Sequence, residues 1–219
     1  QNLNFHQYYS SADASVTNAF ANAAFRLGHS QVSSDLTIID ENGVESALPL
    51  RNAFHNPALI DADPSLVDSL LRGAANQRSE EIDTMIVDDL RNALFGPPGS
   101  GGLDLAAINI QRGRDAGIPN YRNLKSVQGA GQISAFSQIT SDPELAATLA
   151  TVYGNNLSNI DAWIGGLAED HVAGGSVGRT FHAIIDSQFN RLRQGDRFFY
   201  TGAAAGLYTG GVLDPLIRD

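Results

Sequence analysis

The spacing of apolar residues constrains the fold of this chain more than any other feature. In most segments where a pattern can be read, they recur every three or four positions, which is the period of an α-helix. The segments that follow this period or carry helix-capping signals are 13–31, 63–71, 79–94, 104–115, 141–153 and 178–193. No internal repeat or linker divides them. We therefore predict a mainly α-helical fold in a single domain, residues 1–219.

One segment departs from the helical period. Leu36–Ile39 is an apolar run rich in β-branched residues, and Asn42 with Gly43 follows it. Asn-Gly is the strongest short signal for a hairpin, because both central residues of a type I′ turn need positive φ. The sequence therefore predicts one short β-hairpin near residues 36–48.

The charge and composition exclude several classes of protein. The chain has 14 Lys and Arg against 24 Asp and Glu, a net charge of −10, which makes non-specific binding to nucleic acid or an anionic membrane a poor hypothesis. No run of about 18 apolar residues is present, so no membrane span is expected. Without cysteine there is no disulfide, thiolate nucleophile or Cys-ligated metal. The chain begins with Gln1 and shows no signal-peptide pattern, which suggests a processed or excised segment.

Any metal site in this chain would have to be built from His, Asp, Glu or Asn. No two histidines show H-x-H or H-x-x-x-H spacing, so a site built from several of them is not expected. The five histidines are His6, His29, His55, His171 and His182.

Two predicted helices carry faces of unusual composition. On the first, helical spacing places four residues on one side: Asn22, Phe25, Arg26 and His29. On the helix over 104–115, the same spacing groups another four: Leu105, Ile108, Asn109 and Arg112. One interpretation is a histidine hydrogen-bonded in a core, with arginines in surface ion pairs. The other is a planar apolar ligand with anionic edges and a central metal, of which haem is an example.

Six motifs, in order along nearly the whole chain, closely resemble the animal-type haem peroxidases of the peroxidase–cyclooxygenase superfamily. They are Ala24–His29 (AFRLGH), Glu81–Thr84 (EIDT), Asp88–Phe95 (DDLRNALF), Leu103–Asp115 (LDLAAINIQRGRD), Asn159–Glu169 (NIDAWIGGLAE) and Gln188–Phe198 (QFNRLRQGDRF). With no cysteines and short loops, the chain looks more like a bacterial member than a mammalian one. The resemblance implies a haem-peroxidase-like helical domain and haem b as the cofactor.

The resemblance also implies roles for individual residues. His29 matches the proximal ligand to haem iron, and Asn109 the asparagine that accepts a hydrogen bond from the other ring nitrogen of that histidine. Arg26 and Arg112 match the arginines that bind the haem propionates, for which a forked guanidinium is well suited. Arg114 and Asp115, in the same motif, are interpreted as an internal ion pair.

The part of the family that performs peroxide cleavage has no counterpart in this sequence. The distal His with its Gln and Asp, the calcium loop, and the catalytic Arg followed by Glu are not found, so no catalytic residue is assigned. The chain therefore resembles the C-terminal, proximal half of a larger domain. Its expected partners are haem, hydrogen peroxide and an N-terminal half, which would hold any calcium. The resemblance further implies a secreted or extracellular protein.

Three functions follow from this resemblance. The leading hypothesis is a haem peroxidase that uses hydrogen peroxide to oxidise a halide or a small organic donor, inactive without the distal half. The second is a haem-binding or structural fragment without turnover of its own. The third is a relative of the fatty-acid dioxygenases, which would need a tyrosyl radical. Nothing in the sequence selects Tyr121, Tyr153 or Tyr200 for that role.

Overall fold

The computed structural model describes residues 8–92 and 104–199 and is mainly helical, as predicted. Its α-helices and 3-10 helices (η) are α1 (Asn18–Asn22), η1 (Ala24–His29), α2 (Leu50–Ala53), α3 (Ala58–Ala62), α4 (Leu66–Asn76), α5 (Asp88–Arg91), α6 (Leu105–Asp115), α7 (Tyr121–Val127), η2 (Phe136–Gln138), α8 (Pro143–Val152), η3 (Leu157–Asn159), α9 (Ala162–Leu167) and α10 (Arg179–Gly195). Two antiparallel strands, β1 (Asp35–Ile39) and β2 (Glu45–Pro49), form the hairpin.

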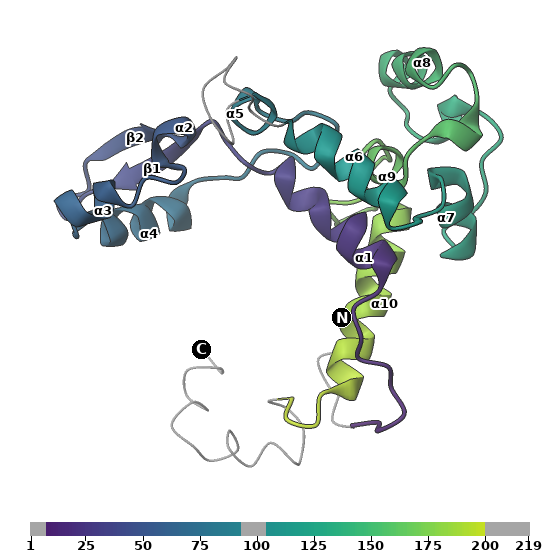
Figure 1. Cartoon of the computed structure of the whole chain (residues 1–219), viewed down its shortest axis with the longest axis horizontal. Coiled ribbons are helices and arrows are strands. Elements are labelled where there is room, and N and C mark those ends of the chain that lie inside the picture. The colour runs from purple at the N-terminus through teal and green to yellow at the C-terminus, as the bar shows by residue number, and fades with distance from the viewer. Residues whose placement is uncertain (1–7, 93–103, 200–219) are drawn as a thin grey trace.

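The elements are spread in arms around a helical centre (Figure 1). The hairpin with α2, α3 and α4 forms one arm, α7 and α8 lie on the opposite side, and α10 extends away from both. At the centre, α1, α6 and α9 lie together, and α9 also contacts η1 and α7. This centre brings the first helical region of the sequence against the helix that begins at Leu105.

Two clusters of buried side chains form the core. The first joins α1, η1, α7, α9 and α10 through Phe20, Ala23, Ala24, Ile82, Leu124, Ala162, Trp163, Leu167, Phe181 and Ile184. The second lies toward α8 and consists of Tyr121, Ile133, Ile139, Leu149, Ile160 and Ala168. Ile164 of α9 packs against both clusters. Most of the apolar burial therefore lies in the centre and in the part of the chain after residue 104.

The hairpin is confirmed, but the predicted turn is wrong. The strands pair from Asp35 with Pro49 to Ile39 with Glu45. Gly43 has φ of +80°, whereas Asn42 does not have the positive φ that a type I′ turn requires of both central residues. Instead, Oδ1 of Asp40 accepts hydrogen bonds from the backbone N–H groups of Asn42 and Val44. The longer connection is stabilised by this side chain, as Asp commonly does in turns.

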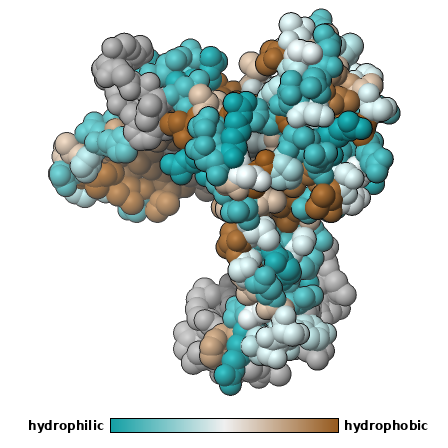
Figure 2. Space-filling view, turned by 45° about the vertical axis from the view of Figure 1, so that its right-hand side comes forward, coloured by the Kyte–Doolittle hydropathy of each residue, from teal (hydrophilic) through white to brown (hydrophobic). Residues whose placement is uncertain are grey.

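Helix α4 packs tightly against β1. Gly73 is buried, and a Cβ atom at this position would overlap the backbone carbonyl of Thr37. Beside this contact, apolar side chains of β1 and α4 line an open groove, including Leu36, Val67 and Leu71. Leu71 is 65% exposed, and apolar colour gathers over this arm in Figure 2.

The first predicted helix is shorter than expected and has two parts. Residues 13–16 are not helical, because Gln188 of α10 bonds the backbone on this side: its Nε2 donates to the carbonyl of Ser15, and its Oε1 accepts from the N–H of Thr17. Thr17 then caps α1. At Ala23, φ of −131° and ψ of −78° interrupt the α-helix, and the chain continues as the 3-10 helix η1.

The predicted helix over 79–94 is mostly wrong. Within the described residues only α5 forms there, and Leu94 lies outside the described range. Other partners take the backbone groups that a helix would use: the N–H of Met85 donates to Oδ1 of Asp83, and the carbonyl of Ile82 contacts Nε2 of His171 at 2.8 Å. Met85 is 73% exposed, so the apolar stripe is not buried as one face.

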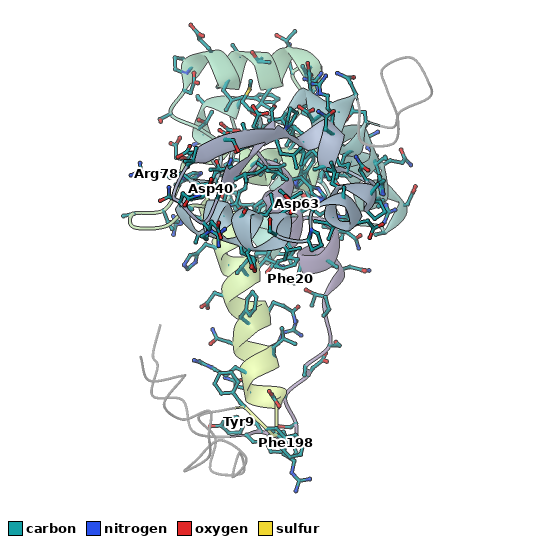
Figure 3. All side chains as sticks on the ribbon, turned by 90° about the vertical axis from the view of Figure 1, so that its left-hand side faces the viewer. Tyr9, Phe20, Asp40, Asp63, Arg78 and Phe198 are labelled. Carbon is teal, nitrogen blue, oxygen red and sulfur yellow. The ribbon has the colours of Figure 1, made fainter. Side chains whose placement is uncertain are left out.

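The later helices agree better with prediction. Asp104 caps α6 by accepting from two backbone N–H groups, and Asp142 caps α8 ahead of Pro143. Helix α10 covers the predicted segment. Figure 3 shows its far end beside Tyr9, whose N–H donates to the carbonyl of Gln194, while Phe20 packs against the body of the helix with its ring centroid 5.8 Å from that of Phe189. Helices α7 and α9 were not predicted. No helix in the described ranges is both long and apolar enough to cross a bilayer.

Candidate functional site

The 3-10 geometry of η1 positions Arg26 and His29. Residues three apart eclipse in such a helix, so these two side chains project from the same side. Both are half-buried. Phe25 falls on another side, where its ring stacks on Phe20 at a centroid distance of 4.7 Å, and it is 60% exposed. The α-helical spacing that grouped Phe25 with His29 does not hold here, and its proposed contact with a cofactor stays a prediction.

Asn109 of α6 connects the two predicted faces. It is fully buried, and its Nδ2 lies 2.7 Å from Nδ1 of His29. Its Oδ1 accepts a hydrogen bond from Nη1 of Arg26 at 2.8 Å, and Nη2 of Arg26 donates to Oδ1 of Asn22 at 3.3 Å. One chain of polar contacts thus joins Arg26 and His29 of η1 to Asn109, which lies at least 80 positions later in the sequence.

The direction of the Asn109–His29 contact differs from expectation. The resemblance implied that Asn109 accepts from the ring, but its amide nitrogen, which can only donate, faces Nδ1. The physical reason is Arg26, whose guanidinium offers only donors and therefore takes the amide oxygen.

The environment of His29 favours the neutral ring. Partial burial and then the positive charge of Arg26 lower the pKa of His29 below its ordinary value, while the hydrogen bond with Asn109 acts in the opposite direction. A neutral imidazole is the form that binds a metal. In the described part of the chain, no hydrogen-bond partner is found for Nε2.

Two arginines make this region positive. Burial, followed by the charge of Arg112, lowers the pKa of Arg26, which remains protonated. Neither Arg26 nor Arg112 forms an ion pair with a described residue. Nε of Arg26 is buried and has no hydrogen-bond partner among the described residues, whereas Arg112 is exposed. Two neighbouring cations that form no ion pair with a described residue suit a ligand with anionic groups.

The two aliphatic residues predicted for the site, Leu105 and Ile108, lie on a different side of α6 from the residues of this helix that pack against the core. Ala106 and Ile110 pack against the first cluster. Leu105 and Ile108 are half-buried and, with Arg112, occupy positions three and four apart on one face. The structure thus places two aliphatics and a cation beside Asn109, while their contact with a ligand stays a prediction.

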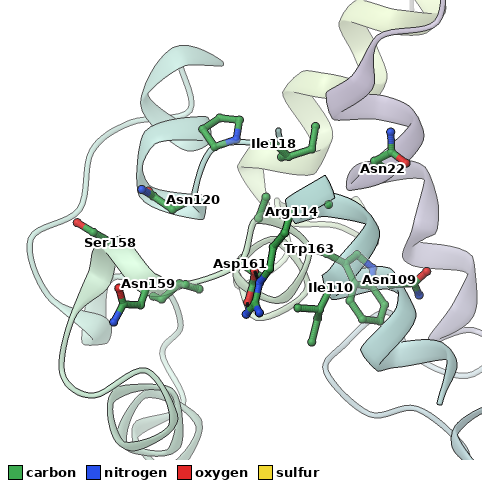
Figure 4. A pocket seen from close by; sticks show the side chains of 14 residues that line it. Asn22, Asn109, Ile110, Arg114, Ile118, Asn120, Ser158, Asn159, Asp161 and Trp163 are labelled. Carbon is green, nitrogen blue, oxygen red and sulfur yellow. Dashed lines mark hydrogen bonds and ion pairs between the residues drawn. The ribbon is translucent and has the colours of Figure 1, made fainter. Parts of the chain in front are cut away.

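A cavity of about 310 Å³ lies on the other side of α6 (Figure 4). Asn109, Arg114, Asp161 and Trp163 help to line it, but His29 does not. The expected ion pair between Arg114 and Asp115 is wrong: Arg114 binds Asp161, and Asp115 instead accepts from Gln111, four residues earlier on the helix.

Sequence reasoning missed a buried polar cluster around Glu169. Its carboxylate accepts hydrogen bonds from the hydroxyl of Tyr121, Nζ of Lys125, and both the N–H and the hydroxyl of Thr180. Glu169 is 5% exposed and Lys125 7%. The available signal was Glu169 directly after the apolar run Ala162–Ala168, where a lone carboxylate needs a buried partner.

Comparison with known proteins identifies similar chains. The profile of a family described as animal haem peroxidase matches residues 1–216. Peroxinectin A of Dictyostelium discoideum is 44% identical over 194 residues, which are 88% of this chain and 36% of that protein. Lactoperoxidase of Mus musculus is 37% identical over 206 residues, 90% of this chain and 29% of that protein. The chain thus spans about a third of the length of these curated relatives.

Solved structures show the same fold. Peroxidase A from Dictyostelium discoideum superposes with a TM-score of 0.87 at 39% identity, over 98% of this chain and 42% of that one. A fatty acid alpha-dioxygenase of Arabidopsis thaliana gives a TM-score of 0.72 at 22% identity, over 89% of this chain and 32% of that one. At that identity, the second likeness concerns the fold alone.

Proposed function

The chain belongs to the animal haem peroxidase family, and on this basis we propose that it forms the proximal side of a haem site at which hydrogen peroxide oxidises a halide or a small organic donor. The observation that carries the proposal is the bond between fully buried Asn109 and Nδ1 of His29. This contact holds the ring through Nδ1, so that Nε2 is the nitrogen open to a metal, which it would bind after losing its proton. Residues that orient a ligating histidine in this way tune the metal as well.

The residues present fit a haem group. Nε of Arg26 is a buried donor that has no partner in residues 8–92 and 104–199, and a propionate carboxylate would satisfy it. Arg112 adds a second unpaired cation nearby, and Leu105 and Ile108 add apolar surface for a porphyrin face. Haem, when bound, supplies the iron centre that exchanges electrons with peroxide and donor.

In this proposal, each side chain has a limited task. His29 holds the iron through Nε2, Asn109 sets the angle of its ring, and Arg26 with Arg112 binds carboxylates. Cleavage of peroxide further needs a base that moves a proton between its two oxygens and a cation that stabilises developing charge. We propose that these groups belong to the part of the family's length that this chain does not span.

Titration with haem tests the proximal assignment. We expect the wild-type chain to give the Soret band of a histidine-ligated haem, His29→Ala to lose it, and His182→Ala to keep it. His182 is an exposed histidine on α10 and serves as the matched control. Retention of the wild-type spectrum in His29→Ala would remove the assignment.

Peroxidase turnover tests whether the groups that cleave peroxide lie outside this chain. A chain with one haem face uncovered should bind haem weakly, because apolar surface stays in water. We expect oxidation of a dye donor by peroxide at a rate near that of free haem, and a large gain when the remainder of a family domain is supplied. A rate well above free haem from this chain alone would show that it contains a distal base.

A further inference from the structure

The cavity on the other side of α6 contains a hydrogen-bond donor that the fold leaves unused. We infer that this cavity, of about 310 Å³, is a second ligand site, which takes a small uncharged organic molecule and holds its ketone or amide oxygen on Nε1 of Trp163. His29 does not line the cavity, so this site is independent of the proposed function.

The cavity runs from an exposed mouth to a buried end. Ser158 and Asn159 are exposed and lie on one side of it (Figure 4). Asn109 and Trp163 lie together on the opposite side, with 0% and 2% of their surface exposed. Apolar side chains complete the walls: Ile110, Ile118, Ile160 and Ala162. A mostly apolar hollow with a few polar groups is the usual form of a small-molecule site.

The indole nitrogen of Trp163 is the atom that points to a ligand. It carries one N–H, which can only donate. Nε1 is buried and has no hydrogen-bond partner among residues 8–92 and 104–199. Because an unpaired buried donor destabilises a fold, nearly all such groups in proteins are bonded. The buried end of the cavity therefore favours an occupant that brings an acceptor.

A water molecule suits this end less well than an organic acceptor does. Buried waters usually make about three hydrogen bonds. The side-chain amide of Asn109, next to Trp163, is already bonded at both of its ends, to His29 and to Arg26. An organic molecule needs only one acceptor atom at Nε1, because the rest of its surface is stabilised by contact with the apolar walls.

Charge and volume define the class of ligand. The charged residues of the lining are Arg114 and Asp161, which bind each other through two hydrogen bonds, so neither offers an unpaired charge to a ligand. A cavity of about 150 Å³ accommodates benzene. This cavity, at about 310 Å³, has room for one ring with a short substituent.

The indole N–H reports binding directly. Trp163 is the one tryptophan among the 219 residues, so it gives a single indole signal in a ¹H–¹⁵N NMR spectrum of the haem-free chain. Acetophenone and α-methylstyrene serve as probes, because they have the same shape and differ in a C=O against a C=CH₂ group. Acetophenone should move the indole proton downfield, with saturation at a Kd on the order of 1 mM. At equal concentrations, α-methylstyrene, which cannot accept, and benzoate, which is charged, should not.

A substitution in the wall tests where the probe binds. Gly113 lines the cavity, and a Cβ atom there would come no nearer than 3.8 Å to the carbonyl oxygen of Asn22, so a larger side chain has room to enter. Gly113→Leu should weaken acetophenone binding at least about fivefold by filling this space. Ala107→Leu adds the same side chain at an exposed position of α6 outside the lining and should bind like the wild type.

Three outcomes would overturn the inference. Absence of a saturable shift with acetophenone would mean that the cavity holds only solvent. An equal shift with α-methylstyrene would mean that the indole N–H does not recognise the ligand, and equal affinities of Gly113→Leu and Ala107→Leu would place the probe elsewhere. The first two are measured on the wild type, so they decide the matter even if Gly113→Leu does not fold. Because no haem is present, none of them bears on the haem titration.

Discussion

The guanidinium of Arg114 donates to both carboxylate oxygens of Asp161, at 2.8 Å from Nε and 2.9 Å from Nη2. The contact fastens the end of α6 to the residue just before α9. Arg114 is 58% exposed, whereas Asp161 is 13% exposed. Solvent screening at the arginine end limits the contribution of such a pair to roughly 1 kcal/mol.

Arg114→Lys should therefore weaken the fold slightly. Lysine keeps the charge but cannot bind both oxygens at once. We expect the free energy of unfolding in urea to fall by about 0.5 to 1 kcal/mol. Arg122→Lys, at an exposed position on α7, is the control and should change it by less. If Arg114→Lys costs the same in an Asp161→Asn background, the two side chains are not coupled.

Tyr153 should make stability depend on alkaline pH. Burial and then the charge of Asp161, which also accepts its hydroxyl at 3.1 Å, raise the pKa of Tyr153 to about 12. The folded chain resists losing this proton while the unfolded chain releases it near pH 10. The contribution of Tyr153 is thus complete below about pH 10 and is lost as the pH rises through 12. Urea titrations from pH 9 to 11 should show a smaller decline in Tyr153→Phe; an unchanged decline would contradict the assignment.

Glu169→Gln should be strongly destabilising. The change leaves Lys125 buried without its counter-charge, which typically costs about 3 to 5 kcal/mol. Urea unfolding followed by the fluorescence of Trp163, the one tryptophan of the chain, measures the loss. Adding Lys125→Met should recover part of it. Glu144→Gln, on the exposed first turn of α8, provides the control, and an equal loss in both single variants would argue against a special role for the buried pair.

The same substitution should have opposite effects in two helices. Gly73→Ala in α4 pushes a methyl group into the backbone of β1 and should cost about 1 to 3 kcal/mol. Gly113→Ala in α6 places its Cβ no nearer than 3.8 Å to the carbonyl oxygen of Asn22 and should stabilise by about 0.5 to 1 kcal/mol through helix propensity. Thermal unfolding of both variants checks this; a neutral Gly73→Ala would mean that α4 does not pack on β1 as described.

His29 should titrate below the ordinary histidine value of 6.5, because it is partly buried and faces the charge of Arg26. Its contribution to stability is complete above about pH 6.5 and declines as the pH falls through the folded pKa, since the unfolded chain binds the proton first. The ring C–H signals in NMR report the midpoint. Arg26→Met removes the positive charge and should raise it. A midpoint at or above 6.5 in the wild type would contradict the described burial.

Local signals predicted the helices that begin with their own cap. The side chains of Asp104 and Asp142 accept backbone hydrogen bonds at the starts of α6 and α8. An Asp at such a position can be recognised in the sequence as a helix cap. The helix predicted from residue 79 is absent over 79–87, because this segment bonds to distant residues in place of forming helical hydrogen bonds. Its partners, such as His171, lie far away in the chain, and an apolar period cannot show that tertiary bonds will replace helical ones.

The site was predictable in its members but not in its connections. Spacing grouped Arg26 with His29, and the resemblance joined Asn109 to His29, as the structure does. The hydrogen bond from Arg26 to Asn109 spans two elements and had no sequence signal. Arg114 was paired with its neighbour Asp115, because adjacency is visible in a sequence and the approach of α9 is not.

Ile164 packs against both buried clusters, so the centre and the α7–α8 side share a common set of contacts. Among the described residues, none of the hairpin arm belongs to both clusters in this way. Within the arm β1 packs on α4, and the ion pair between Arg51 and buried Asp89 connects the arm to α5. Amide hydrogen exchange would therefore divide this chain into two opening units of different protection. The hairpin and α4 would exchange first, while the bonds from Asn109 to His29 and Arg26 would persist until the centre itself opens.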